Sequence, residues 1–240
     1  MRNIKKILLI ILSVFILLIS GILIYVKVVT YAPTIEAKEV MESISKTNNL
    51  YIFEPDEAIA NLIFYPGGFV DEKAYAVFLN GLKNEGIRVF LVSMPLKLAI
   101  LNSNAAKNIY QTYPSDLPWY IMGHSLGGAT ASIFLSQNPN WIDGLILLAS
   151  YPANSSDLSQ SNINVISIYG DQDFVLDIEK VEATKSLLPN NTEYHRISGG
   201  NHAYFGHYGE QKGDGIASIT RDYQQQLTIE IIIAFLENNS

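Results

Sequence analysis

The sequence Gly-His-Ser-Leu-Gly at residues 123–127 contains a serine in a spacing that could support nucleophilic catalysis. An apolar segment precedes it and a helical pattern follows it, so the motif is predicted at a strand-to-helix junction. A sharp turn at this point needs small neighbours, which Gly123 and Gly127 supply, and it exposes the hydroxyl of Ser125. The N–H of Leu126, at the start of the helix, could stabilise an oxyanion there. The competing interpretation is an ordinary glycine-rich turn.

A serine hydroxyl is a weak nucleophile, and it needs a base and a third group that orients this base. Suitable residues follow Ser125 in the chain. Asp171 and Asp173 come directly after an apolar segment, and His202 follows a pair of glycines after the next one. His202 is the predicted base, with His207 as the alternative. The acids could orient the base or cap the turn in which they lie.

A second oxyanion donor is expected from the loop at residues 66–69, which follows the apolar segment 59–65. Its glycines allow backbone amides to turn toward the serine. The N–H of Gly68 is the predicted partner of the Leu126 N–H, while Gly67 and Phe69 are alternative donors.

The loop at residues 203–215 is rich in glycine and aromatic residues and directly follows the predicted base. Its aromatic side chains could line a substrate pocket, although packing in the core is an equally good explanation for Phe205. The predicted substrate-binding residues are Phe69, Tyr204, Phe205 and Tyr208.

Apolar segments alternate with helical patterns along the chain, which predicts a doubly wound, mostly parallel α/β sheet. The predicted reactive residues all follow strand ends, where sites in such sheets collect. About fourteen residues separate the segments 144–149 and 164–169, which is short for a large helical lid. Strands are predicted at 50–54, 59–65, 87–92, 119–122, 144–149, 164–169 and 194–198, and helices at 71–85, 104–113, 126–137, 175–187 and 222–237.

The N-terminal segment contains twenty uncharged, mostly apolar residues at 7–26, which is long enough to cross a bilayer. Arg2, Lys5 and Lys6 precede it, so an uncleaved signal anchor would leave the rest of the chain outside the cytoplasm. A cleaved signal peptide is the alternative. We therefore predict an anchor at 1–29, a weakly structured stem at 30–48 and one folded domain at 49–240, at the cell membrane.

Composition excludes several classes of function. The chain has no cysteine, which rules out disulfides, thiolate metal sites and a cysteine nucleophile. Residues 28–240 carry 12 basic and 23 acidic residues, a net charge of −11 that is unfavourable for binding nucleic acid. The sequence contains no P-loop or dinucleotide motif and no histidines at metal-ligand spacing, so no cofactor and no metal are expected.

With these residues the chain resembles the α/β-hydrolase superfamily, and more narrowly the small lidless group related to dienelactone hydrolases. The resemblance covers about residues 59–226 and is carried by the motifs at 65–70, 94–96, 123–128, 169–173 and 199–206. It implies a Ser-Asp-His triad, in which the spacing after Gly170 selects Asp173 as the acid. Dienelactone hydrolases have a cysteine nucleophile, whereas this chain has Ser125.

The implied function is that of a membrane-anchored serine hydrolase that cleaves a carboxylic ester or similar acyl substrate through an acyl-enzyme. Two alternatives remain at this stage. One is an acyltransferase or peptidase that acts on cell-envelope material, and the other is a non-catalytic hydrolase-like domain that binds a ligand.

Overall fold

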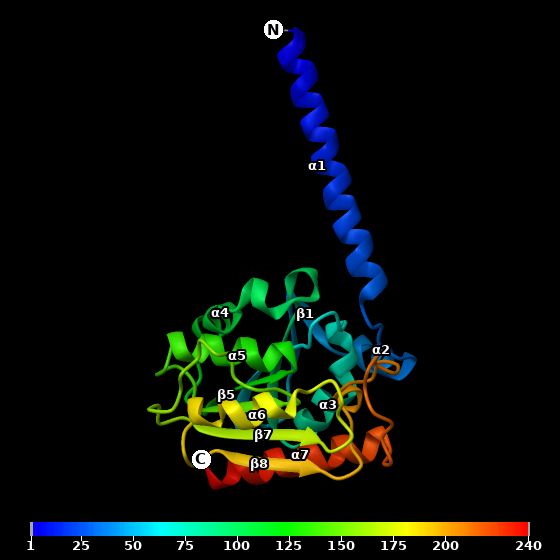
Figure 1. Cartoon of the computed structure of the whole chain (residues 1–240). Helices are drawn as coiled ribbons and strands as arrows, with labels where there is room; N and C mark the ends of the chain where they lie inside the picture. Colours follow the sequence, from blue (N-terminus) through cyan, green and yellow to red (C-terminus); the bar gives the residue numbers. More distant parts are fainter. Residues whose placement is uncertain (1, 240) are drawn as a thin grey trace. The chain divides into compact units, whose positions relative to one another are not determined.

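The computed structural model describes residues 2–239, and one eight-stranded sheet lies at the centre of residues 31–239 (Figure 1). The strand order is β1-β2-β4-β3-β5-β6-β7-β8. Strands β3 to β8 run parallel, whereas β1 and β2 are antiparallel at one edge. This confirms the predicted doubly wound, mostly parallel architecture. The strands are β1 (Ser45–Thr47), β2 (Leu50–Phe53), β3 (Ala60–Tyr65), β4 (Ile87–Val92), β5 (Trp119–His124), β6 (Gly144–Leu148), β7 (Asn164–Gly170) and β8 (Glu193–Ile197).

Helices cover both faces of this sheet, which is why every residue of β3, β5 and β6 is buried. Side chains alternate along β3, so that Phe64 joins the core beneath α3 and α7 while Ile63 joins the core beneath α4 and α5. The helices are α3 (Ala76–Asn84), α4 (Ala105–Thr112), α5 (Leu126–Gln137), α6 (Ile178–Thr184) and α7 (Arg221–Asn238), with short 3-10 turns η1 (Glu72–Tyr75), η2 (Pro95–Lys97), η3 (Ala99–Asn102), η4 (Lys185–Leu187) and η5 (Ala203–Phe205).

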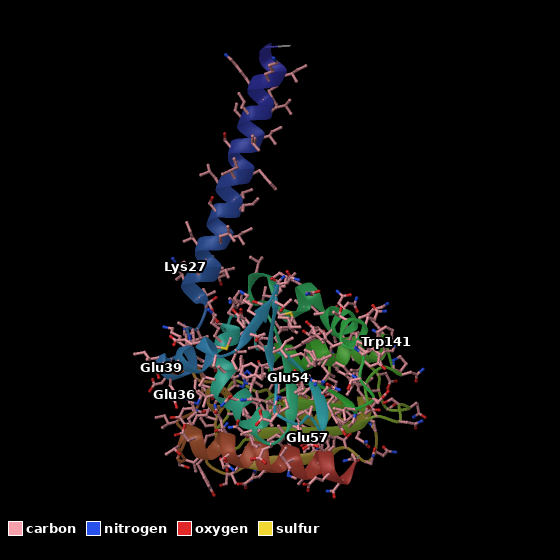
Figure 2. The ribbon with its side chains drawn as sticks, turned by 180° about the vertical axis from the view of Figure 1, so that it is seen from behind. Lys27, Glu36, Glu39, Glu54, Glu57 and Trp141 are labelled. Carbon is pink, nitrogen blue, oxygen red and sulfur yellow. The ribbon has the colours of Figure 1, made fainter. Side chains whose placement is uncertain are left out.

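The residues up to Thr30 form a unit separate from the rest of the chain. They contain α1 (Arg2–Val29), and Ile4–Val29 of this helix includes an 18-residue window that has a mean hydropathy of 3.3 and is not buried by other residues. Figure 2 shows the side chains of α1 projecting outward along its length. The helix is long and apolar enough to cross a membrane, and a signal sequence would have the same properties.

The segment predicted as a weakly structured stem is instead part of the folded unit. Thr34 caps α2 (Ile35–Glu42) by accepting a hydrogen bond from the N–H of Ala37. Ala37 and Met41 are one helical turn apart and are buried in the core, and the following residues form β1, which pairs with β2. The stem prediction is therefore wrong for this part of the chain, because Ala37 and Met41, together with the partly buried Val40, dock a helix of low overall hydrophobicity on the core.

Helix α6 is shorter than the predicted helix at 175–187. The carboxylate of Asp173 accepts hydrogen bonds from the N–H groups of Val175 and Leu176, which holds these residues in a turn. The helix begins only after Asp177, whose side chain caps it. The other predicted strands and helices are present with small shifts at their ends.

Candidate active site

Ser125 lies between β5 and α5 with φ 53° and ψ −123°, a conformation that residues with a side chain rarely adopt. A Cβ atom on Gly123 would lie 2.3 Å from the carbonyl carbon of Gly127, and one on Gly127 would lie 2.1 Å from the carbonyl oxygen of Tyr65. Neither position has room for a side chain, so the strand and helix approach closely enough to hold the strained turn. The N–H of Ser125 donates to the carbonyl of Leu148 at 2.9 Å.

The structure brings Asp173 and His202 together from the ends of β7 and β8. The Nδ1 atom of His202 lies 2.8 Å from Oδ2 of Asp173, and the two side chains are 2% and 0% exposed. The other carboxylate oxygen of Asp173 accepts the N–H groups of Val175 and Leu176 at 3.0 and 2.8 Å. The carboxylate is therefore fixed on both sides, and it directs the opposite nitrogen of the imidazole, Nε2, away from itself.

The loop that carries His202 is closed by Asp214. Its carboxylate accepts hydrogen bonds from the N–H groups of His202 and Ala203, at 3.2 and 2.8 Å. The preceding Asn201 is held by Gln224 of α7, which accepts its N–H at 3.0 Å and donates to its carbonyl at 2.8 Å. These bonds fix the backbone on both sides of the imidazole.

Ser125 and His202 line one cavity of about 250 Å³, which also includes Tyr151, Val175 and Leu176. Ser125 and His202 form no hydrogen bond with each other among the described residues. Catalytic hydrogen bonds are often long in the absence of substrate, and rotation about χ1 of the serine changes the position of its hydroxyl. The cavity therefore contains a strained serine and a histidine that is paired with a buried carboxylate.

The alternative acid and the alternative base have other partners. Asp171 accepts a 2.7 Å hydrogen bond from the N–H of Gly199, which is the main reason that its pKa is lowered. His207 is buried between Glu36, at 3.2 Å, and Gln225, at 3.1 Å. Asp171 thus joins the loops after β7 and β8, and His207 joins α2 to α7.

Three backbone amides of the loop at residues 66–69, here called the oxyanion loop, are candidate donors, and two of them already form hydrogen bonds. The N–H of Gly67 donates to the hydroxyl of Tyr75 at 3.0 Å, and the N–H of Phe69 donates to the carbonyl of Lys97 at 2.9 Å. Within residues 2–239, the N–H groups of Gly68 and Leu126 have no hydrogen-bond partner. A Cβ atom on Gly68 would lie 3.1 Å from Cδ2 of Leu126, so these two residues are adjacent.

His124 is a part of the site that the sequence did not reveal. Its Nδ1 lies 2.8 Å from the hydroxyl of Tyr75, and its ring centroid lies 4.5 Å from that of His202. Burial, followed by repulsion from His202, holds the pKa of His124 well below its usual value. Burial also raises the pKa of Tyr75, whose hydroxyl binds both the Gly67 N–H and His124. A neutral His124 therefore connects the oxyanion loop to the ring of His202.

The predicted substrate-binding residues do not line the cavity. Phe205 and Tyr208 are fully buried in the core, and Tyr204 packs beneath the guanidinium of Arg221. Phe69 lies in a left-handed conformation (φ 54°) on the oxyanion loop. The pocket prediction is therefore wrong for the loop after His202, whose aromatic rings stabilise the fold. Tyr151, Val175 and Leu176 line the cavity instead, and their positions just after β6 and Asp173 were the available signal.

No group of three or more His, Asp or Glu residues suited to holding a metal ion occurs among the described residues.

Solved structures with the same fold include dienelactone hydrolase from Anabaena variabilis, at 15% identity and a TM-score of 0.59 over 77% of this chain and 90% of that one. Est1E from Butyrivibrio proteoclasticus is 15% identical, with a TM-score of 0.59 over 81% and 98%. A soluble variant of monoglyceride lipase from Saccharomyces cerevisiae is 11% identical, with a TM-score of 0.61 over 82% and 95%.

A search of curated protein sequences finds no significant match. The sequence model of the alpha/beta hydrolase family matches residues 61–226, which span the sheet from β3 to the start of α7 and include the cavity. This range contains the strained Ser125 and the Asp173–His202 pair. The chain belongs to the α/β-hydrolase family.

Proposed function

We propose that this α/β-hydrolase is a membrane-tethered serine hydrolase that cleaves a carboxylic ester or a similar acyl substrate. The observation that carries the proposal is the buried 2.8 Å contact between Asp173 and His202 beside a cavity that also contains Ser125. An imidazole held by a carboxylate in a protected position is the arrangement that a serine hydroxyl requires for activation.

In the proposed reaction, Oγ of Ser125 attacks the acyl carbon while Nε2 of His202 accepts its proton. The negative charge on the acyl oxygen is stabilised by the N–H groups of Gly68 and Leu126, which have no other partner among the described residues. His202 then protonates the leaving group, and Asp173 stabilises the imidazolium in both steps. Water, activated by the same imidazole, attacks the acyl-enzyme and releases the acid.

The cavity supports an acyl substrate. Ala129, Val175 and Leu176 provide apolar lining near Ser125, and the polar lining residues besides the serines are Tyr151 and His202. Acyl-ester chemistry also appears in the names of proteins with this fold, among them a monoglyceride lipase and an acyl-protein thioesterase from Zea mays.

The tether in this proposal is α1. The apolar run at residues 7–26 of this helix carries no charge, Arg2, Lys5 and Lys6 precede it, and Lys27 follows it. The positive-inside tendency then places the catalytic unit outside the cytoplasm.

Labelling with a fluorophosphonate probe tests the serine. The wild-type protein is expected to be labelled and to hydrolyse 4-nitrophenyl butyrate, whereas Ser125→Ala should abolish labelling and lower kcat by about 10⁴-fold or more. Ser136→Ala is the matched control, because Ser136 lies on the same helix α5 but outside the cavity. Undiminished hydrolysis by Ser125→Ala would refute the proposal.

A further inference from the structure

Residues 31–34, here called the lead-in segment, bind directly to the loops that carry the site. The N–H of Tyr31 donates to the carbonyl of Phe69 at 2.8 Å, and the carbonyl of Tyr31 accepts the N–H of Asp71 at 3.0 Å. At the other end of the segment, the N–H of Thr34 donates to the carbonyl of His207 at 2.8 Å. The lead-in segment therefore lies between the oxyanion loop and the loop after His202.

The candidate span ends at Val29, two residues before Tyr31. Two residues of extended chain cover at most about 7 Å. If α1 crosses a bilayer, as the proposed function requires, covalent continuity alone keeps the oxyanion loop close to the membrane surface. The two hydrogen bonds between Tyr31 and the residues Phe69 and Asp71 pass this restraint on to the loop after β3.

Exposed apolar side chains are concentrated at the same edge of the sheet. Residues 31–239 expose nine large hydrophobic side chains, and five of them lie on the loops that follow β4, β7 and β8. Three others are in the first turns of α2, α6 and α7, whereas Ile59 precedes β3 at the opposite edge. We call the five loop residues the apolar rim: Leu96, Ile100, Leu101, Phe174 and Ile216.

Two side chains of the apolar rim are strongly exposed. Phe174 is 69% exposed and Ile216 is 92% exposed. The cation next to Leu96 is neutralised, because Lys97 lies 2.5 Å from Glu72 and 3.1 Å from Asp71. Attraction to anionic headgroups is therefore a poor explanation of this surface, and insertion of apolar side chains is a better one.

A bilayer also fits the position of the apolar rim better than a second copy of the chain does. Leu96, Ile100 and Leu101 follow β4, whereas Phe174 directly precedes Val175, which lines the cavity. A protein that covered both groups would block access to Ser125. A lipid surface would cover them and at the same time supply acyl chains.

We propose that the apolar rim inserts into the bilayer that holds α1, so that the cavity opens at the lipid surface and accepts acyl esters of membrane lipids. This inference rests on the proposed tethered hydrolase and specifies its substrate class. Hydrolysis of such an ester consumes one water molecule, and it releases a fatty acid and an alcohol.

Fluorescence quenching tests the insertion independently of catalysis. The natural chain has no cysteine, so single cysteines at Leu101 and Phe174 can be labelled with NBD without background. Ile59 is the matched control, because Ile59 and Leu101 are both 53% exposed. In full-length protein reconstituted into phosphatidylcholine liposomes, doxyl-labelled lipids should quench the dye at 101 and 174 but not at 59. Equal quenching at all three positions, or a shielded dye at 101 that lipid does not quench, would overturn the proposal.

Two hydrolysis assays distinguish activity on esters in a membrane from activity on a soluble ester. Ile100→Asp/Leu101→Asp should slow cleavage of a long-chain monoacylglycerol in these liposomes by about tenfold or more, because it removes apolar contact with lipid. Cleavage of soluble 4-nitrophenyl butyrate should be unchanged, and Ile59→Asp should change neither rate. An equal loss of both activities would overturn the proposal. A wild-type protein that cleaves neither ester but shows the expected quenching would refute the hydrolase function and leave the membrane contact in place.

Discussion

The amino and carboxyl ends of the sheet differ in the volume of their cavities and in the backbone conformation of the residues around them. The amino end has the larger cavity, of about 860 Å³, lined by residues such as Trp119, Trp141 and Asn164. None of its described lining residues has a positive φ. At the carboxyl end the cavity beside Ser125 has about 250 Å³, and another beside Asp173 has about 540 Å³. Non-glycine residues with positive φ follow four successive strands there: Phe69, Leu96, Lys97, Ser125 and Ala149.

Left-handed conformations of such residues cost about 1–3 kcal/mol each, so they persist only where the surrounding structure enforces them. At the carboxyl end they place the oxyanion loop, the serine and the wall of the cavity formed by Ala149. Backbone strain therefore coincides with the candidate site in this molecule, whereas the largest cavity lies at the other end of the sheet.

The largest loss of activity is expected when the proposed base at the carboxyl end, His202, is replaced. His202→Ala should lower kcat for 4-nitrophenyl butyrate by about 10⁴-fold, because it removes the group that is proposed to take the serine proton. His195→Ala is the control, since this histidine lies on β8 and pairs with Glu193. Comparable losses in the two variants would show that the effect is structural rather than catalytic.

A smaller effect is expected from the oxyanion loop. A Cβ atom at Gly67 would lie 2.8 Å from His124 Nδ1 and 2.9 Å from the Tyr75 hydroxyl, so Gly67→Ala displaces the loop. Loss of one oxyanion donor should lower kcat by about 10²-fold. Gly209→Ala is the matched control because nothing lies within 4 Å of its Cβ position. Steady-state kinetics that show equal kcat for the two variants would contradict this role.

The buried His124 predicts a pH dependence of stability. Its folded-state pKa is lowered, mainly by burial, so the unfolded chain binds a proton near pH 6.5 that the folded chain does not bind. The free energy of unfolding should therefore fall as pH decreases from 7 to 5, by at most about 1.4 kcal/mol per pH unit for this histidine. Urea unfolding at pH 7, 6 and 5 measures the slope.

His124→Asn keeps a hydrogen-bond acceptor for Tyr75 and removes the titrating group. Its slope should be shallower than that of the wild type but not zero, because the pKa of His207 is also lowered by burial. An unchanged slope would mean that His124 does not contribute to the pH dependence of the free energy of unfolding.

The smallest effect on activity is expected at the amino end. Trp141, labelled in Figure 2, packs against Tyr110 with ring centroids 5.3 Å apart and lies beneath Lys107. Trp141→Ala should reduce stability by about 1–3 kcal/mol and leave kcat within about twofold of wild type. A large loss of kcat at unchanged stability would show that the larger cavity contributes to function.

Local sequence was enough to predict the turn at Ser125, because Gly123 and Gly127 have no room for a side chain. The apolar strands likewise predicted the sheet, since residues buried on both faces leave a continuous pattern. The identity of the cavity wall could not be predicted in the same way. Phe205 is as apolar as a pocket residue would be, and only its complete burial among residues that are distant in the sequence shows that it belongs to the core.

Asp214 accepts hydrogen bonds from the N–H groups of His202 and Ala203, and these bonds close the following loop at its base. The loop has two parts that differ in how well they tolerate substitutions and insertions. Beyond the buried Tyr208, added Cβ atoms at Gly209 and Gly213 would meet nothing within 4 Å. Insertions between these glycines would lengthen a stretch that is clamped at its base, so the imidazole would keep its position. This stretch is thus the natural place to graft a cap domain and alter the choice of substrate while leaving the chemistry intact.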